Sequence, residues 1–321
     1  MSKASEHTCR SCRSTGLRPF LDLGCSPIAD ALVSEGQKRE PDAVYPLEAA
    51  FCPHCSLVQI LETLPPEVLF CRDYPYYSSV SDSWLEHSRQ HAEALIDKLA
   101  LSPESLVVEI ASNDGYLLRN FLERGIQVLG IDPANGPADA AREIGIETLD
   151  AFFSEELAHK LKRQGRRPDV IIANNVLAHV ADTRGFVRGL RALINQGGLV
   201  SIEVPYVRDL IENVEFDTIY HQHLCYFSVT SITKLLESEN MFVQEVERLP
   251  THGGSLRIYA GTTSSSSRNL TELLSEERTL GLDRLDFYAD FAGQVGLIRD
   301  LLVTLLAKIR AEGKRVVGYG A

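Results

Sequence analysis

The sequence predicts an α/β protein in which a Rossmann-like parallel sheet follows a small N-terminal zinc-binding module. From residue 106 onward, short apolar runs alternate with helical periodicity, the pattern of a parallel sheet covered by helices. Two Cys-x-x-Cys pairs precede this region and have the spacing of metal ligands. We expect strands near residues 106–110, 127–131, 147–149, 169–174 and 198–204, and a terminal hairpin of strands 242–249 and 255–261 that completes seven strands.

Length and charge narrow the class of protein. The chain has 321 residues, of which 44% are hydrophobic, so it can bury a full core and allows two or three domains. Its net charge of −12 argues against nucleic acid as a partner, because that affinity depends on clustered Lys and Arg. No apolar run approaches the roughly 18 residues of a membrane helix, and the N-terminus has no apolar signal core. We expect a cytoplasmic protein with no membrane partner.

Four of the seven cysteines form two close pairs. Two Cys-x-x-Cys turns can close a tetrahedral thiolate site around Zn²⁺, with the ligands Cys9, Cys12, Cys52 and Cys55. Such a site has no open position for substrate, so the zinc is expected to be structural. Pro and Gly interrupt residues 1 to about 60, and we expect the metal to supply stability that this segment lacks. The alternatives to a zinc site are a redox Cys-x-x-Cys or free thiols. If one of the four thiolates is not a zinc ligand, His54 and Cys25 are the candidates to replace it.

The expected organisation has three parts. Residues 1–75 form the zinc-binding module and a connecting segment, residues 76–262 form the cofactor-binding domain, and residues 263–321 form a linker and a helical region. The linker is the polar run at 264–268. The final residues, 315–321, predict an apolar strand running into a glycine turn. We interpret them as the first strand of a further domain whose remainder is absent.

A strand-to-helix turn at residues 109–115 is the expected ligand site. Such a turn leaves backbone amides free, and its small side chains, Glu-Ile-Ala-Ser-Asn-Asp-Gly, admit a ligand. Asp132 ends the next strand about 20 residues later, where a carboxylate can accept both hydroxyls of a ribose. The turn lacks the glycine spacing of a dinucleotide site, G-x-G-x-x-G. It therefore favours an adenosyl ligand without a pyrophosphate over a nicotinamide dinucleotide.

Polar residues gather where later strands end. Asn174 and His179 follow the fourth strand, at the carboxyl edge of the sheet, and are expected to face the pocket. The block at 216–228 carries two histidines, two tyrosines and a glutamine within seven residues, which are costly to bury without partners. A site role explains them best, and a His-x-His metal site is the weaker alternative. Of the two histidines, His221 is the better candidate for a purely structural role. The tyrosines at 74–79 either pack between domains or belong to the site.

These motifs together resemble the S-adenosylmethionine-dependent sugar C-methyltransferases, which methylate a carbon of nucleotide-linked keto-deoxysugars. The resemblance covers nearly the whole chain. It rests on the paired cysteines, Tyr-x-Tyr-Tyr-Ser-Ser at 74–79, the 109–115 turn, Gly-Ile-Asp-Pro at 130–133, Asn-Asn-Val-Leu-Ala-His-Val at 174–180, Tyr-His-Gln-His at 220–223 and Thr-His-Gly-Gly-Ser at 251–255. It implies a class I methyltransferase sheet, S-adenosylmethionine as cofactor and a nucleotide-activated keto-deoxysugar, with C3 as the accepting carbon.

The resemblance also implies roles for individual residues. His223 is the base that removes the proton beside the C4 carbonyl, at a pKa near the ordinary imidazole value, and Tyr220 lies beside the developing enolate. Tyr76 and His179 support them, and Gln222 is the remaining residue expected in the catalytic set. S-adenosylmethionine is expected across residues 109–115, with Asp132 on the ribose and the adenine near 151–152. The expected cofactor-binding residues are Glu109, Ala111, Ser112, Asn113, Gly115, Asp132, Pro133, Ala151, Phe152 and Asn174.

The chain departs from the family pattern in two places. Gln222 stands where the family usually has Glu, so a role that needs a carboxylate there is in question. Only Gly-Tyr-Gly-Ala at 318–321 corresponds to the family's C-terminal Rossmann-like domain. The rival hypotheses are therefore a truncated, weakly active or inactive cofactor-binding remnant and a dinucleotide-dependent oxidoreductase. A monomer or a weak homo-oligomer is expected.

Overall fold

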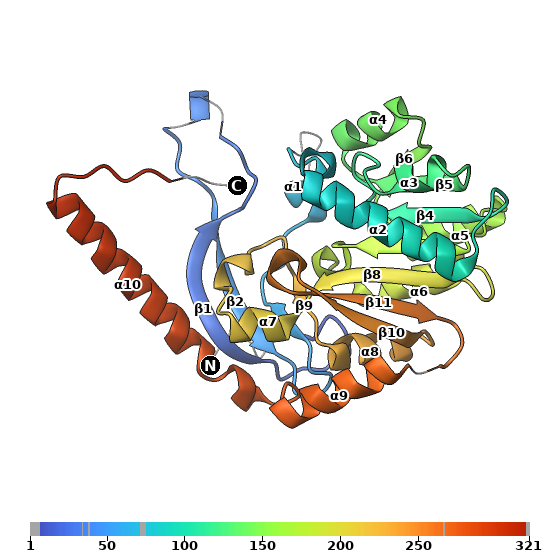
Figure 1. Cartoon of the computed structure of the whole chain (residues 1–321). Coiled ribbons are helices and arrows are strands. Elements are labelled where there is room, and N and C mark those ends of the chain that lie inside the picture. The colour runs from blue at the N-terminus through green and yellow to red at the C-terminus, as the bar shows by residue number, and fades with distance from the viewer. Residues whose placement is uncertain (1–6, 34, 38, 71–74, 266, 319–321) are drawn as a thin grey trace.

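A computed structural model describes residues 7–33, 35–37, 39–70, 75–265 and 267–318. Its centre is a seven-stranded sheet in the order β10-β11-β8-β7-β4-β5-β6 (Figure 1). All neighbours are parallel except β11, which runs antiparallel to both β8 and β10. The strands are β4 (Leu106–Ile110), β5 (Gln127–Asp132), β6 (Thr148–Asp150), β7 (Val170–Asn174), β8 (Leu199–Pro205), β10 (Phe242–Leu249) and β11 (Ser255–Gly261). The expected parallel sheet and its terminal hairpin are confirmed.

Helices cover both faces of this sheet. Alternate residues of β4 point to opposite faces, so Val107 packs toward α2 and α3 while Val108 packs toward α5 and α6. The helices are α1 (Pro66–Leu69), α2 (Asp82–Leu99), α3 (Leu118–Leu122), α4 (Asn135–Glu143), α5 (Glu155–Arg163), α6 (Thr183–Leu193), α7 (Val207–Glu212), α8 (Val229–Ser238), α9 (Arg268–Leu280) and α10 (Phe291–Ala311). Short 3-10 turns join them: η2 (Glu35–Gln37), η3 (Ser78–Val80), η4 (Leu177–His179), η5 (Phe216–Thr218), η6 (Thr251–Gly253) and η7 (Leu285–Tyr288).

The N-terminal region forms a second, four-stranded antiparallel sheet in the order β1-β2-β3-β9. Its strands are β1 (Arg18–Pro27), β2 (Val44–Phe51), β3 (Val58–Ile60) and β9 (Cys225–Tyr226). The last strand is supplied by the block at 216–228, which lies some 170 residues later in the chain than β3. The catalytic block predicted from the sequence is therefore attached by strand pairing to the cysteine-bearing lobe.

The N-terminal lobe, which comprises strands β1 to β3 and the two cysteine pairs, makes more apolar contacts with the rest of the protein than its sequence indicated. Phe51 packs against Tyr288 of η7 with ring centroids 5.1 Å apart, and Phe20 lies 5.2 Å from the same ring. The lobe shares one continuous hydrophobic core with the seven-stranded sheet. Metal is thus not its sole source of stability. The sequence reading missed this support because the partners come from residues more than 200 positions away.

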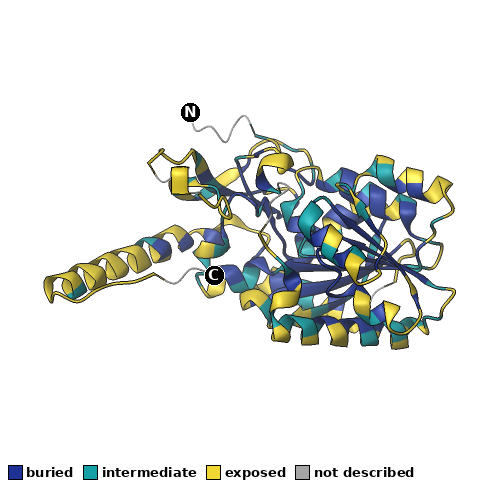
Figure 2. Cartoon of the chain, turned by 90° about the horizontal axis from the view of Figure 1, so that it is seen from above, coloured by how far each residue is buried: buried dark blue, intermediate teal, exposed yellow. Residues whose placement is uncertain are grey.

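The C-terminal helix α10 projects from the body of the molecule and is largely exposed (Figures 1 and 2). Residues 314–318 follow it without forming a strand, so the strand expected from Arg315 is wrong over the described residues. Val316 and Val317 are exposed, and no described strand pairs with them. A strand needs a neighbour for its backbone hydrogen bonds. The last three residues of that expectation, 319–321, lie outside the described residues. No described helix is long and apolar enough to cross a membrane.

Candidate active site and metal centre

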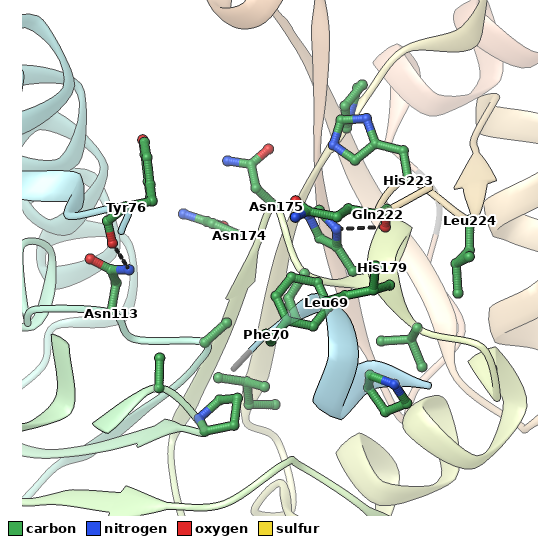
Figure 3. Close-up of a pocket in the computed structure, with 18 of the residues that line it drawn as sticks. Leu69, Phe70, Tyr76, Asn113, Asn174, Asn175, His179, Gln222, His223 and Leu224 are labelled. Carbon is green, nitrogen blue, oxygen red and sulfur yellow. Dashed lines mark hydrogen bonds between the residues drawn. The ribbon is translucent and has the colours of Figure 1, made fainter. Parts of the chain in front are cut away.

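A cavity of about 680 Å³ opens at the carboxyl edge of the parallel sheet, between the sheet and the N-terminal lobe (Figure 3). Its volume is ordinary for a small-molecule site. The wall includes all five residues expected in catalysis, namely Tyr76, His179, Tyr220, Gln222 and His223. It also includes most of those expected to bind cofactor: Ala111, Asn113, Asp132, Pro133, Ala151, Phe152 and Asn174. Chain segments that the sequence placed in separate motifs therefore meet in one space.

The turn after β4 is built around the carboxylate of Asp132. The backbone N–H of Asn113 donates to its Oδ2 and that of Ala134 to its Oδ1, each at 2.8 Å. Burial raises the pKa of Asp132, and these two hydrogen bonds oppose the rise. Ala111 and Asn113 both adopt positive φ, 57° and 49°, which closes the turn around the carboxylate. The arrangement leaves each oxygen with a lone pair for a ligand hydroxyl.

Three of the expected cofactor residues, Glu109, Ser112 and Gly115, are not on the cavity wall. Glu109 is buried beneath the turn, where desolvation and the charges of Asp132 and Asp114 raise its pKa well above the usual range. Ser112 fills the space above a glycine in β5, and a Cβ on Gly115 would come within 2.5 Å of a side chain in the loop before β6. These residues support the turn from behind.

Asn174 lines the cavity and carries a buried, unpaired acceptor. Its Nδ2 donates to Nδ1 of His91 at 3.3 Å, and Oδ1 is buried without a hydrogen-bond partner. His91, on α2, is engaged at its other nitrogen by Ser201 Oγ at 3.0 Å. Desolvation, then the charge of Arg257, lowers the pKa of His91 to about 3, so the ring is neutral and fixes the amide. A buried acceptor of this kind fits a cationic or hydroxyl-bearing ligand, as S-adenosylmethionine is.

The aromatic loop is fastened to the same turn. Asn113 Nδ2 donates to the carbonyl of Tyr76 at 3.1 Å, and its Oδ1 accepts from the backbone N–H of Ser78 at 2.9 Å (Figure 3). Asp114 Oδ2 accepts from the N–H of Ser79 at 3.1 Å. Tyr76 faces the cavity and is 49% exposed. The loop thus belongs to the cofactor side of the site; Tyr74 lies outside the described residues.

His223 and Tyr220 form a hydrogen-bonded pair. The ring of His223 donates from Nδ1 to the carbonyl of Thr218 at 2.9 Å, and Tyr220 Oη donates to its Nε2 at 3.0 Å. Desolvation, followed by the neighbouring His179, lowers the pKa of His223 to about 3, and desolvation raises that of Tyr220 to about 12. The pKa of His223 thus lies below the near-ordinary imidazole value that we expected, because partial burial disfavours the charged ring.

The remaining block residues have distinct partners. His179 donates from Nδ1 to the carbonyl of Gln222 at 2.8 Å, and its ring centroid lies 4.9 Å from that of His223 (Figure 3). The amide of Gln222 donates to Asp30 Oδ2 at 3.2 Å, which brings a carboxylate from the N-terminal lobe to the cavity. The buried ring of His221 donates from Nε2 to the carbonyl of Pro46 at 3.1 Å, whereas its Nδ1 is buried without a hydrogen-bond partner.

Trp84 and His252 are among the aromatic residues of the wall that were not predicted from the sequence. Their rings lie 4.8 Å apart, and Trp84 also stacks on His87 at 4.8 Å. Behind them Glu203 bonds both His87 and Arg257. Burial alone would raise the pKa of Glu203, but these partners lower it to about 2. The available signals were the chain's single tryptophan and the Thr-His-Gly-Gly-Ser motif.

The four paired cysteines converge in the N-terminal lobe. The sulfurs of Cys9, Cys12, Cys52 and Cys55 all lie within 4.8 Å of one another. Cys9 and Cys55 are 3.4 Å apart and Cys12 and Cys52 3.6 Å, far beyond a disulfide bond. Tetrahedral Zn–S bonds of about 2.3 Å imply sulfurs about 3.8 Å apart, so the set fits Zn²⁺. His54 and Cys25 are not part of the group.

Three family models match successive parts of the chain. Residues 9–70 match a model described as "Putative zinc binding domain", residues 84–245 a methyltransferase domain, and residues 250–321 a C-methyltransferase C-terminal domain. C-methyltransferase NovU of Streptomyces niveus is 31% identical over 316 residues, which are 98% of this chain and 75% of NovU. The chain belongs to the zinc-binding C-methyltransferase family. This C-methyltransferase is accordingly an S-adenosylmethionine-dependent enzyme, and its four-cysteine cluster lies in the part of the chain that matches the zinc-binding model.

More distant similarities cover only part of this chain. A ubiquinone biosynthesis O-methyltransferase of Azorhizobium caulinodans is 28% identical over 30% of the C-methyltransferase chain and 38% of its own. A solved Pyrococcus horikoshii protein aligns with a TM-score of 0.48 at 14% identity, over 60% of this chain and 97% of its own. The 1,6-didemethyltoxoflavin-N1-methyltransferase of Burkholderia thailandensis aligns with a TM-score of 0.47 at 19% identity, over 67% and 96%.

Proposed function

We propose that the protein transfers a methyl group to the carbon beside the ketone of a nucleotide-linked keto-deoxysugar, with C3 as the acceptor. The observation that carries the proposal is the Tyr220–His223 pair, which lies on the same cavity wall as the cofactor residues Asp132 and Asn174. S-adenosylmethionine, when bound, supplies an electrophilic methyl group. The protein's task is to make a carbon nucleophilic, which requires a base and a donor to the enolate oxygen.

The hydrogen bond between Tyr220 and His223 couples the proposed base to the proposed donor for the enolate oxygen. With Nδ1 of His223 donating to Thr218, its Nε2 carries the lone pair that can accept a proton from carbon. In the resting site that lone pair is occupied by the hydroxyl of Tyr220. A ketone oxygen that accepts from Tyr220 would free Nε2 at the same time. One rearrangement then exposes the base and stabilises the enolate.

The charge of the cavity wall indicates which parts of the cofactor and the substrate can enter the cavity. The cavity is lined by the acids Asp30, Asp132, Asp182, Glu215 and Asp217, and no Lys or Arg is among its described lining residues. Such a wall suits the positive sulfonium of the cofactor and an uncharged sugar ring. We therefore propose that the ring of the substrate enters the cavity while its diphosphate stays at or beyond the mouth.

The division into residues 1–75, 76–262 and 263–321 stays a proposal. The zinc-bearing lobe, through β9, supports the catalytic block, and we propose a structural role for its metal. The methyltransferase sheet carries the cofactor turn.

The test is turnover with labelled cofactor. Incubation with methyl-labelled S-adenosylmethionine and a set of nucleotide-linked 4-keto-deoxysugars should place label on a ring carbon, and the free sugars should react poorly. Deuterium washout beside the ketone, measured with S-adenosylhomocysteine in place of the donor, should occur and should need His223. Cofactor binding with neither washout nor transfer would favour the inactive remnant. Calorimetric binding of a nicotinamide dinucleotide and not of S-adenosylmethionine would favour the oxidoreductase.

A further inference from the structure

Arg10 lies within the first cysteine pair, between Cys9 and Cys12, and is only 6% exposed. Its guanidinium donates to the carbonyl of Ile60 at 2.5 Å, to the carbonyl of Glu62 at 2.9 Å and to Thr63 Oγ1 at 2.6 Å. All three acceptors are uncharged groups at the end of β3. A buried guanidinium with this set of acceptors organises backbone that would otherwise be unsatisfied.

The same side chain reaches the catalytic block. Its Nη1 also lies 3.5 Å from the carbonyl of Leu224, the residue directly after His223. That carbonyl accepts a second hydrogen bond from the backbone N–H of Ile60 at 3.1 Å. Arg10 therefore sits in the fork where β3 ends and β9 begins. It holds together two carbonyls that lie more than 160 residues apart in the sequence.

Backbone contacts extend the link to His179. The N–H of Leu224 donates to the carbonyl of Ala178 at 2.8 Å, and the carbonyl of Arg10 accepts from Thr183 Oγ1 at 2.9 Å. The 3-10 turn that carries His179 ends at that residue, and helix α6 starts at Thr183. Both catalytic histidines are thus tied to the same cysteine turn through buried hydrogen bonds.

We propose that Arg10 is a positioning residue that couples the zinc-binding turn to the segments carrying His223 and His179. The fork geometry is the reason for an arginine, because the planar guanidinium donates from two separate nitrogens, Nη1 and Nη2, whereas an ammonium group donates from a single nitrogen. The zinc lobe then acts on the site through β3, β9 and Arg10. The loop at 75–79, by contrast, is held by Asn113 and Asp114 of the methyltransferase domain.

The test uses Arg10→Met and Arg10→Lys, with Arg18→Met as the matched control. Arg18 is an exposed arginine of the same lobe at the start of β1. Four quantities are measured on the full chain: zinc per chain, S-adenosylmethionine affinity by calorimetry, the ring signals of His179 and His223 in ¹H–¹⁵N spectra, and turnover. The histidine signals do not depend on the proposed reaction, so they test the coupling even if that proposed function fails.

We expect Arg10→Met to keep its zinc and its cofactor affinity, to shift or broaden both histidine signals, and to lose about a hundredfold in turnover with a smaller change in KM. Arg10→Lys should not restore the signals, and Arg18→Met should match the unmodified protein. Unmoved histidine signals in a zinc-loaded Arg10→Met protein overturn the proposal.

If Arg10→Met does not fold, a milder variant, Thr63→Val, tests the same coupling. Thr63→Val removes the 2.6 Å acceptor and leaves the cysteine turn untouched. Shifted histidine signals in Thr63→Val support the coupling, and signals identical to those of the unmodified protein refute it. Absence of methyl transfer by the unmodified protein on every substrate counts against the proposed function alone.

Discussion

The hydroxyl of Tyr220 lies 3.0 Å from Nε2 of His223, whose other ring nitrogen donates to the carbonyl of Thr218. These two bonds hold His223 as the neutral tautomer with its lone pair toward the cavity. The pair is closed in the absence of substrate, since the acceptor nitrogen is occupied. In the proposed mechanism, a ligand must draw the hydroxyl away before His223 can accept a proton.

Replacement of His223 by Ala should lower turnover about a hundredfold or more, because the acceptor for the carbon-bound proton is lost. S-adenosylmethionine affinity, measured by calorimetry, should stay within about twofold, because the residues expected to bind it are on other segments. A His221→Ala variant, which alters a ring bonded to Pro46 on the lobe side, serves as the comparison. Equal turnover in His223→Ala and the unmodified protein would exclude His223 as the base.

The lowered pKa of His223 predicts a specific loss of stability in acid. In the unfolded chain this ring takes up a proton near pH 6.5, whereas in the folded protein its pKa is about 3. The unfolded state therefore binds more protons between these values, and the free energy of unfolding falls as pH drops from 6.5 toward 3. The ring's contribution approaches about 1.4 kcal/mol per pH unit. Denaturant unfolding measures the free energy of unfolding at pH 7 and at pH 5. Its decrease between these pH values should be smaller for His223→Gln than for the unmodified protein, and equal decreases would contradict the lowered pKa of His223.

Replacement of Gln222 by Glu should set two carboxylates against each other, because the amide of Gln222 now donates to Asp30 at 3.2 Å. The new acid would keep its proton to higher pH in the folded than in the unfolded state. Its penalty, on the order of 1 kcal/mol, should grow as pH rises above the carboxylate range. Thermal unfolding at pH 5 and pH 8 measures this difference. The Gln222→Glu, Asp30→Asn double variant should remove it, and a persistent penalty there would point to another cause.

Replacement of Cys52 by Ser should release the zinc, since a four-thiolate site loses one ligand. Elemental analysis should find about one zinc per chain in the unmodified protein and much less in the variant. Turnover and substrate affinity should fall because β9 pairs with the lobe, while S-adenosylmethionine binding should survive. Cys25→Ser changes an exposed cysteine outside the cluster and should keep its metal. A Cys52→Ser protein that is metal-free and fully active would show that the cluster has no structural role.

The sequence by itself determined the parallel sheet and the identity of the main site segments. β4 covers residues 106–110 and β11 residues 255–261 as expected, because apolar runs bounded by polar and glycine turns are a local signal. The cysteine spacing predicted the cluster, and the carboxyl-edge rule predicted that Asn174 and His179 would face the cavity. Each of these inferences uses residues close together in the chain.

Only the tertiary structure decided how these segments act on one another. The pairing of β9 with β3, the approach of Asp30 to Gln222 and the bond from Arg10 to Leu224 join residues 166 to 214 positions apart. The hydrophobic pattern of the sequence does not predict such contacts, because each segment has the same local pattern whichever distant segment it contacts. The pKa of His223 belongs to the same class: its value is set by the removal of water and by His179, both of which exist only once the chain has folded.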